Sequence, residues 1–191
     1  MRDIVLASAS PRRKELLSQL GIDFTVDPMN GNEENDTNLE PHKLVRFIAA
    51  KKAYAVAARH LNAIIIAADT IGVLEGKILG KPNTPAAARK MLLEMSGKAH
   101  RVITGYTVLD TTTAHSISNS VETIVYIKSI TRQEINAYVA TGEPLDKAAA
   151  YGIQGRGAVI VERIEGDYFN VVGLPLFALA NTLKELGINV L

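Results

Sequence analysis

The segment SASPRR at residues 8–13 constrains this chain more than any other. It follows a short apolar run, Ile4–Ala7, which predicts a β-strand. Ser10 is a favoured helix N-cap, and Pro11 suits the first helical position because that residue needs no backbone N–H. Leucines at helical spacing come next. The sequence therefore predicts a strand that leads into an amphipathic helix.

The beginning of this helix has the chemistry of an anion site. Its first-turn N–H groups and the positive end of the helix dipole attract negative charge. Further donors that fit phosphate oxygens come from the side chains of Ser8, Ser10, Arg12 and Arg13. An ordinary capped surface helix with solvated arginines has the same pattern, so both interpretations stay open for this segment alone.

The bulk composition favours one globular unit over residues 1–191. With 47% hydrophobic residues, a chain of this length can form one good core. Its 21 basic and 20 acidic residues are interspersed, so the net charge of +1 creates no long-range field that would attract nucleic acid or an anionic membrane. We therefore expect neither as a partner, and any phosphate binding must be local.

The sequence contains no cysteine and no long apolar segment. The lack of cysteine excludes disulfides, thiol nucleophiles and thiolate metal sites, and it agrees with a reducing compartment. The longest apolar stretch, Ala63–Ala68, is far too short to span a bilayer, and the N-terminus lacks the apolar segment of a signal peptide. We therefore expect a cytoplasmic protein without a membrane anchor.

The order of the predicted elements indicates an α/β or α+β fold around a mixed sheet. Hydrophobic periodicity and capping residues predict further helices from Pro41, over Thr84–Met95, from Thr131 to about Gly142 and from Pro175. Strands are predicted over Phe24–Val26, Ile64–Ala68, His100–Leu109, Ile117–Lys128 and Ala158–Ile164. The two longest strands alternate apolar and polar residues, which predicts an antiparallel pair with one solvated face. Residues 30–36 and 143–157 are predicted loops.

Asp69 is the sharpest catalytic candidate. It lies just past the uniformly apolar strand Ile64–Ala68, and a carboxylate at the C-terminal edge of such a strand points into the crevice where open α/β sheets bind ligands. The hydroxyl of Thr70 offers another ligand or donor there, which favours function over a simple turn cap. A magnesium-like ion needs one or two carboxylates from separate loops, and Glu33 or Glu34 can supply the second. A solvated acidic loop has the same composition.

Two lysines and a glutamine complete the candidates. Lys52 lies among apolar residues of a predicted helix, and Lys81 lies in a Gly-Lys-Pro turn. Lysine serves phosphate as a mobile point charge, although each lysine alone is more often a surface residue. Gln154 lies in the segment at residues 143–155, whose density of functional side chains suggests a recognition loop, and its amide can donate to one base-edge atom and accept from the neighbouring one. A buried glutamine that satisfies a turn is an equal alternative.

These motifs, in their order and spacing, resemble the Maf family of nucleotide pyrophosphatases, also called septum-formation inhibitor proteins. The resemblance spans nearly the whole chain and rests on Ser8 to Arg13, Glu33-Glu34, Ala68-Asp69-Thr70, Gly80-Lys81-Pro82, Ser96-Gly97, Asp146 to Gly155 and Gly166 to Pro175. It implies an α/β fold like that of inosine-triphosphate pyrophosphatases, with a mixed twisted sheet, flanking helices and two lobes around a cleft. It also implies a divalent cation and a homodimer.

The resemblance extends to the substrate. Family members hydrolyse a nucleoside triphosphate to the monophosphate and pyrophosphate. The segment DKAAAYGIQG, residues 146–155, is similar to the branch that acts on dTTP and UTP rather than the branch that acts on 7-methyl-GTP. Ala149 is a departure, because that branch usually has glycine at this position.

The resemblance also implies roles for individual residues. Asp69 corresponds to the catalytic acidic residue. The specificity positions of the family correspond to Arg12, Thr70 and Gln154, and the remaining charged positions of the pocket correspond to Lys52, Lys81 and Glu34.

The resulting hypothesis is a house-cleaning pyrophosphatase. A Mg²⁺ or Mn²⁺ ion held by Asp69 and Glu34 bridges the phosphates while water attacks the α-phosphorus, and Asp69 acts as base or metal ligand. Arg12 and the two lysines stabilise the leaving pyrophosphate, and Gln154 reads the pyrimidine edge. The alternative is a non-catalytic nucleotide-sensing regulator of cell division, which would bind nucleotides without turnover.

Overall fold

The computed structural model describes residues 2–29 and 39–191. Glu33, Glu34 and the predicted loop at residues 30–36 therefore lie outside the described residues. The strands are β1 (Asp3–Leu6), β2 (Thr25–Val26), β3 (Ala63–Leu74), β4 (Lys77–Leu79), β5 (Ala99–Asp110), β6 (His115–Ile127) and β7 (Val161–Glu165). The helices are α1 (Pro11–Ser18), α2 (Pro41–Ala57), α3 (Pro85–Met95), α4 (Arg132–Ala140), α5 (Tyr168–Val172) and α6 (Leu176–Glu185), with 3₁₀ helices η1 (Glu143–Asp146), η2 (Ala148–Ala150) and η3 (Gly155–Ile160).

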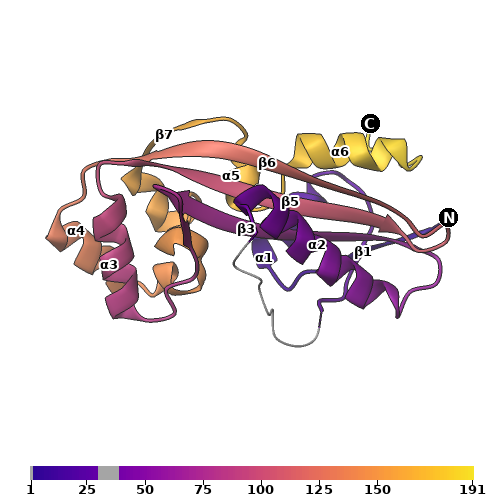
Figure 1. Ribbon diagram of the computed structural model, residues 1–191, viewed down its shortest axis with the longest axis horizontal. Coiled ribbons are helices and arrows are strands. Elements are labelled where there is room, and N and C mark those ends of the chain that lie inside the picture. The colour runs from indigo at the N-terminus through magenta and orange to yellow at the C-terminus, as the bar shows by residue number, and fades with distance from the viewer. Residues whose placement is uncertain (1, 30–38) are drawn as a thin grey trace. The chain divides into compact units, whose positions relative to one another are not determined.

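Hydrogen bonds join the seven strands into a mixed sheet (Figure 1) in the order β2-β1-β3-β5-β6-β7, with β4 paired to β3. β1 runs parallel to β2 and to β3, whereas β4 is antiparallel to β3 and β7 is antiparallel to β6. Helices flank this sheet. The prediction of an α/β fold with a mixed sheet is therefore confirmed.

The caps that the sequence predicts are present in two helices. The hydroxyl oxygen of Thr84 accepts a hydrogen bond from the N–H of Ala87 in the first turn of α3. In α4, Thr131 and Glu134 form the reciprocal capping box, because each side chain accepts a hydrogen bond from the backbone N–H of the other. These local hydrogen bonds explain why both helices begin where the sequence predicts.

The chain forms two compact units, each built from separate segments. Unit 1 contains Met1–Asp69, Thr104–Val121 and Gly173–Leu191, and unit 2 contains Thr70–Ile103 and Glu122–Val172. Strands β3, β5 and β6 contribute residues to both units.

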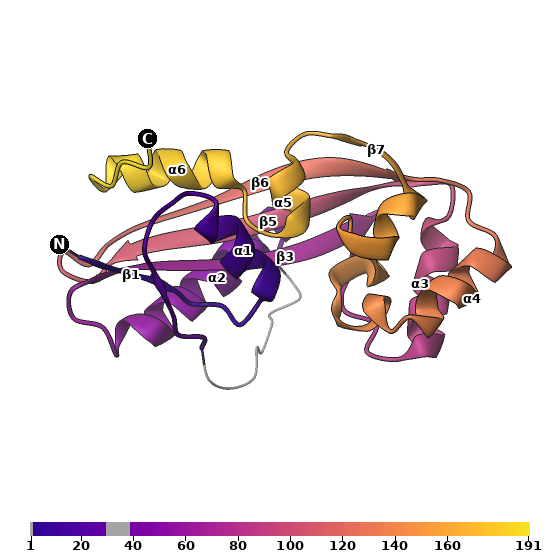
Figure 2. The same ribbon diagram turned by 180° about the vertical axis from the view of Figure 1, so that it is seen from behind.

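In unit 1, helices cover both faces of the strands. On one face, Ala53 and Val56 of α2 belong to a buried cluster with residues of β1, β3 and β5. On the other face, the hydroxyl of Tyr106 on β5 lies 3.0 Å from the hydroxyl oxygen of Thr182 on α6. Figure 2 shows α2 and α6 on opposite sides of these strands. Strands β3 and β5 of unit 1 are therefore covered on both sides.

This double covering corrects one prediction. The strand β5 lacks the predicted solvated face, because its residues from Thr104 to Asp110 are all buried. Neighbouring side chains of a strand point to opposite faces, so Gly105 faces α2 while Tyr106 faces α6. The alternation of polar residues in β5 comes from threonines, whose hydroxyls form hydrogen bonds such as the one between Thr107 and Ser118 at 2.8 Å.

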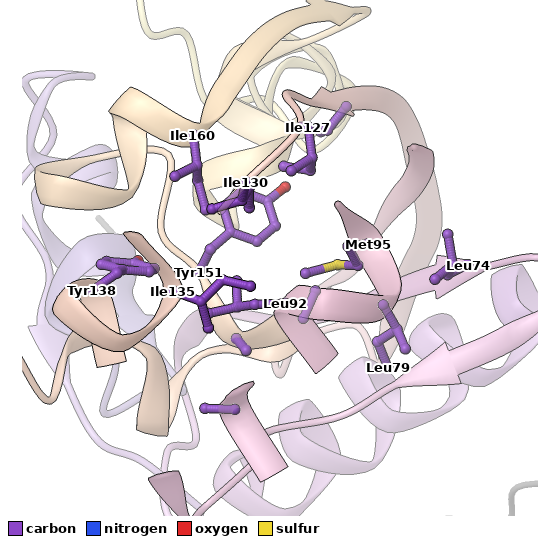
Figure 3. Packing of buried hydrophobic residues seen from close by; sticks show 14 of the residues in the cluster. Leu74, Leu79, Leu92, Met95, Ile127, Ile130, Ile135, Tyr138, Tyr151 and Ile160 are labelled. Carbon is purple, nitrogen blue, oxygen red and sulfur yellow. The ribbon is translucent and has the colours of Figure 1, made fainter. Parts of the chain in front are cut away.

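The core of unit 2 gathers around α3, α4 and the segment after α4. Figure 3 shows Tyr151 among Leu92 of α3, Ile135 of α4 and Ile130. The hydroxyl of Tyr151 lies 3.0 Å from Nε2 of His100, and the two rings meet edge to face. This segment was a predicted loop, but it folds into η1, η2 and η3 and thereby contributes buried side chains to the core.

The predicted strand Ala158–Ile164 begins later than expected. Residues up to Ile160 belong to η3, and β7 begins at Val161. The N–H of Gly157 donates a hydrogen bond to the Glu143 carboxylate, which holds the backbone there in a turn instead of a strand. That contact comes from a residue far back in the sequence, so the local pattern could not show it.

Gly105 is expected to tolerate no side chain. A Cβ atom there would lie 2.4 Å from the carbonyl carbon of Val45, and α2 cannot shift without disturbing the core. Gly105→Ala should therefore lower the free energy of unfolding by at least about 2 kcal/mol, measured by urea denaturation. Gly80→Ala is the matched control, because a Cβ there meets nothing within 4 Å. Equal stabilities of the two variants would contradict this packing.

Acid is expected to destabilise unit 2 through His100. Burial lowers the pKa of this imidazole to about 4 from an ordinary value of 6.5. Between these values the unfolded chain binds a proton that the folded chain does not, so stability is complete above pH 6.5 and decreases as the pH falls towards 4. The loss should reach about 3 kcal/mol. Urea denaturation of wild type and His100→Gln at pH 7 and pH 4 measures it, and the same loss in both proteins would refute the assignment.

Candidate active site

The candidate site begins where the parallel pairing of β1 with β3 ends. Leu6 is the last β1 residue in register, opposite Ile66, and the N–H of Ala7 then donates to the carbonyl oxygen of Ile66 at 2.8 Å. Ser8 follows on one chain segment and Asp69 on the other. Both residues thus follow the carboxyl ends of two neighbouring parallel strands, which is where open α/β sheets bind their ligands.

Asp69 lies within β3, so the prediction that the strand ends at Ala68 was wrong. The strand continues because Ile71, Val73 and Leu74 are buried apolar residues, and because residues from Gly72 onwards form a hairpin with β4. Asp69 therefore lies in a stretch that pairs with neither β1 nor β4. The carboxyl end of the parallel pairing, rather than the end of the strand, marks its position.

Asp69, which is half-buried, forms an ion pair with the buried Lys52. The Nζ atom of Lys52 lies 2.8 Å from Oδ1 of Asp69, and the side chains are 9% and 13% exposed. Alternation along β3 puts Asp69 on the same face as Ile65 and Ala67, which is the face that α2 covers. Lys52 reaches from α2 to this face, so both residues of the pair belong to unit 1.

The SASPRR segment folds around the Ser8 side chain. Oγ of the buried Ser8 accepts hydrogen bonds from the N–H of Ser10 at 3.2 Å and from Nη1 of Arg13 at 3.4 Å. Nε of Arg13 also donates to the carbonyl oxygen of Gly173 at 2.8 Å. Arg13 is therefore a structural link between two distant segments of unit 1, and the half-buried Arg12 lies beside it.

Helix α1 begins as the sequence predicts, with Ser10 at the N-cap and Pro11 next. Within the described residues, the Ser10 side chain forms no capping hydrogen bond to the N–H groups of the first turn. Its hydroxyl thus does not compete for the donors that a bound anion would use. The absence of acidic residues from the first turn also suits an anion.

Three predicted residues belong to unit 2. Thr70 follows Asp69 on β3, and Gln154 lies just before η3. Both residues are half-buried, whereas Lys81 is exposed. Two backbone hydrogen bonds join the Lys81 turn to the segment that leads to Gln154. The N–H of Ala149 donates to the Gly80 oxygen, and the N–H of Asn83 donates to the Leu145 oxygen, each at 3.2 Å.

Ala149 has a backbone conformation that explains why glycine suits this position. Its φ of 59° and that of Ala150 at 57° lie in the left-handed region, which costs an alanine about 1–2 kcal/mol. The close approach of β3 adds a second constraint, because a Cβ on Gly72 would lie 2.9 Å from that of Ala149. Gly72 on β3 therefore leaves room for the Cβ atom of Ala149.

The donor chemistry at Asp69 fits a divalent cation that is shared with a substrate. Mg²⁺ binds through one or two carboxylates together with substrate phosphates and water molecules. Over residues 2–29 and 39–191, no three His, Cys, Asp or Glu side chains gather as a metal cage. Of the predicted metal-binding pair Asp69 and Glu34, only Asp69 lies within the residues that the structure describes.

Sequence reasoning did not single out Glu143 and Tyr138, which organise the loop around Gln154. The Glu143 carboxylate accepts hydrogen bonds from the hydroxyl of Tyr138 at 2.8 Å and from the N–H groups of Arg156 and Gly157, each at 3.1 Å. The closely spaced glycines between residues 152 and 157 were the available signal, since glycine allows such close approaches of the backbone.

The fold is α/β, and its candidate site lies where this class of protein binds ligands. The family model described as Maf-like protein matches residues 3–186. The chain therefore belongs to the Maf family.

Relatives in this family are similar to the chain over its full length. A protein of Methanosarcina mazei named dTTP/UTP pyrophosphatase is 51% identical over 191 residues, which cover 100% of this chain and 97% of the relative. A protein of Moorella thermoacetica with the same name is 50% identical over 190 residues, which cover 100% and 98%. Among solved structures, the Staphylococcus aureus Ham1 protein has a TM-score of 0.47 and 15% identity over 66% of this chain and 72% of that one.

Among the helices of the described residues, none is both long and apolar enough to cross a membrane.

Removal of one member of the Lys52–Asp69 pair should destabilise unit 1. Lys52→Met leaves a carboxylate buried without its partner and should lower the free energy of unfolding by about 3 kcal/mol. The double variant Lys52→Met/Asp69→Asn removes that buried charge and should recover part of the loss, as measured by urea denaturation. Lys43→Met, an exposed position on the same helix, serves as the control. A double variant less stable than Lys52→Met would contradict the pairing.

Proposed function

We propose that this protein hydrolyses dTTP and UTP to the monophosphate and pyrophosphate. The half-buried carboxylate of Asp69, held by Lys52 at the carboxyl end of the parallel strands, is the observation that carries the proposal. The names of the full-length relatives support the substrates, because about half of all residues are identical. In the reaction, an oxygen of water forms a bond to the α-phosphorus as the bond to the leaving pyrophosphate oxygen breaks.

Asp69 accepts the proton of the attacking water in this proposal. Lys52 donates a hydrogen bond to Oδ1 and thereby fixes the orientation of the carboxylate. A positioned general base of this kind contributes about 10²–10⁴-fold to a rate. Lys52 also provides a positive charge beside the phosphates, where negative charge accumulates as pyrophosphate leaves.

The SASPRR segment binds the phosphates. Ser8, Ser10 and Arg12 supply polar and charged donors beside the first-turn N–H groups of α1. Arg13 contributes mainly by positioning, since its guanidinium already donates to Ser8 and Gly173. Lys81 adds a mobile positive charge from its turn.

Base selection is assigned to Thr70 and Gln154. The amide of Gln154 can both donate and accept, as two neighbouring polar atoms on a pyrimidine edge require. A Mg²⁺ or Mn²⁺ ion held by Asp69 and Glu34 would neutralise phosphate charge when bound. We further infer, from the family resemblance, a single Maf-like domain over residues 1–191 that acts as a cytoplasmic homodimer.

Replacement of Asp69 tests this proposal. Asp69→Asn keeps the size of the side chain but cannot accept a proton, so kcat for dTTP and UTP should fall by about 10²–10⁴-fold. The assay is pyrophosphate release from dTTP, UTP, CTP, ITP and 7-methyl-GTP with Mg²⁺ or Mn²⁺. Asp23→Asn, an exposed carboxylate in the same unit, should retain wild-type rates.

Three results would contradict the proposal. Full activity of Asp69→Asn would show that Asp69 is not the general base. Turnover of a purine nucleotide in preference to dTTP and UTP would refute the assigned selectivity. Saturable nucleotide binding without pyrophosphate release would instead favour a sensor.

A further inference from the structure

One carboxylate in unit 2 accepts hydrogen bonds from three donors that lie in two separate parts of the chain. Oε1 of Glu143, at the beginning of η1, accepts hydrogen bonds from the Tyr138 hydroxyl at 2.8 Å and from the Gly157 N–H at 3.1 Å. Oε2 accepts one from the N–H of Arg156, also at 3.1 Å. Both carboxylate oxygens are therefore used by the segment that follows Gln154 and by helix α4.

Tyr138 extends this arrangement to the other side of Gln154. Its hydroxyl donates to Glu143 and accepts a hydrogen bond from the N–H of Gly152 at 3.1 Å. Tyr138 is only 7% exposed and belongs to the core cluster of unit 2, so its packing holds the side chain in place. The backbone is thus held two residues before Gln154 and again two and three residues after it.

The glycines of this loop make the close contacts with Glu143 and Tyr138 possible. A Cβ on Gly157 would lie 2.6 Å from the Tyr138 hydroxyl and 2.2 Å from the carbonyl oxygen of Gly152. A Cβ on Gly155 would lie 3.1 Å from Oε2 of Glu143, and its φ of 75° also favours glycine. The loop can therefore close around the carboxylate only with this glycine pattern.

Electrostatics agree with an ionised Glu143. Burial alone would raise the pKa of this carboxyl group. The hydrogen bonds from the Tyr138 hydroxyl and the two backbone N–H groups, together with the charge of Lys147, outweigh burial and hold the pKa below its ordinary value of 4.5. The group therefore remains an acceptor for all three donors at neutral pH.

We propose that Glu143, acting with Tyr138, is the positioning residue that sets the place of the Gln154 amide and thereby the selectivity for the pyrimidine base. This inference rests on the proposed function, in which Gln154 reads the base edge. Glu143 itself touches no substrate in this proposal. It acts by fixing the backbone on both sides of the residue that does.

Glu143→Gln is the sharpest test, because it keeps the shape of the side chain and replaces one acceptor oxygen of the carboxylate with an NH₂ group. In either orientation of the amide, its NH₂ group must face a backbone N–H, that of Arg156 or that of Gly157, and one hydrogen bond is lost. Glu162→Gln is the matched control, because this glutamate is exposed on β7.

The first measurement is amide hydrogen exchange of residues 152–157, which needs no substrate. Exchange should be faster by about 10-fold or more in Glu143→Gln and unchanged in Glu162→Gln. The second is kcat and KM for dTTP, UTP and CTP. Selectivity for dTTP over CTP should fall by about 10- to 100-fold through KM, because a shift of about 1 Å can cost 100-fold, while kcat for dTTP stays within a few-fold.

Tyr138→Phe provides an independent variant if Glu143→Gln does not fold. It keeps the buried ring but removes the hydroxyl that joins Glu143 to Gly152, so exchange and selectivity should change in the same direction. A wild-type protein that selects dTTP and UTP, with unchanged selectivity in the folded variants, would overturn the positioning role alone. A wild-type protein without turnover of any nucleotide would overturn the proposed function and the selectivity role together.

Discussion

The parallel pairing of β1 with β3 determines where the candidate site residues Ser8 and Asp69 lie. Asp3 of β1 lies opposite Ala63 of β3, and the register continues to Leu6 opposite Ile66, where it stops. Ser8 and Asp69 therefore follow the paired ends of neighbouring strands. The same pairing needs apolar side chains on both faces, and α2 covers the face from which Asp69 projects. Lys52 can therefore reach Asp69 from a helix whose other inward residues are apolar. A buried charge is tolerated there because it is paired at 2.8 Å.

Most of the fold could be predicted from the sequence because it depends on local signals. The caps Thr84 and Thr131 define two helix starts, and the apolar run at residues 64–68 predicts a strand buried on both faces. The predictions are wrong where contacts between residues distant in the sequence determine the burial or the length of a strand. The burial of β5 on both faces needs α2 and α6, and the strand β3 continues beyond Ala68 because β4 pairs with it.

The candidate site also contains some residues that the sequence indicates and others that only the structure identifies. Asp69 and the SASPRR segment could be proposed as site residues from the sequence, because the proposal depends only on residue type and on position after a strand. The involvement of Lys52 with Asp69 needed the structure, since many helices carry a lysine among apolar residues. Glu143 and Tyr138 could not be found from spacing, because their importance comes from backbone N–H groups, which every non-proline residue has. The glycines near Gln154 indicated a tight loop without showing which side chain it surrounds.

The link from Arg13 to Gly173 has a consequence for protein synthesis. Arg13 lies near the beginning of the chain, whereas its acceptor belongs to the last segment of unit 1, which also supplies α6 as the cover over β5. Arg2 depends on the same late segment through its hydrogen bond to the carbonyl oxygen of Leu186. A nascent chain on the ribosome therefore lacks the helix that covers the Tyr106 face of β5 until residues 176–185 have been synthesised. The hydrogen bond from Arg13 to the carbonyl oxygen of Gly173 likewise forms only after residue 173 has been synthesised, so the SASPRR segment takes its final shape late in synthesis.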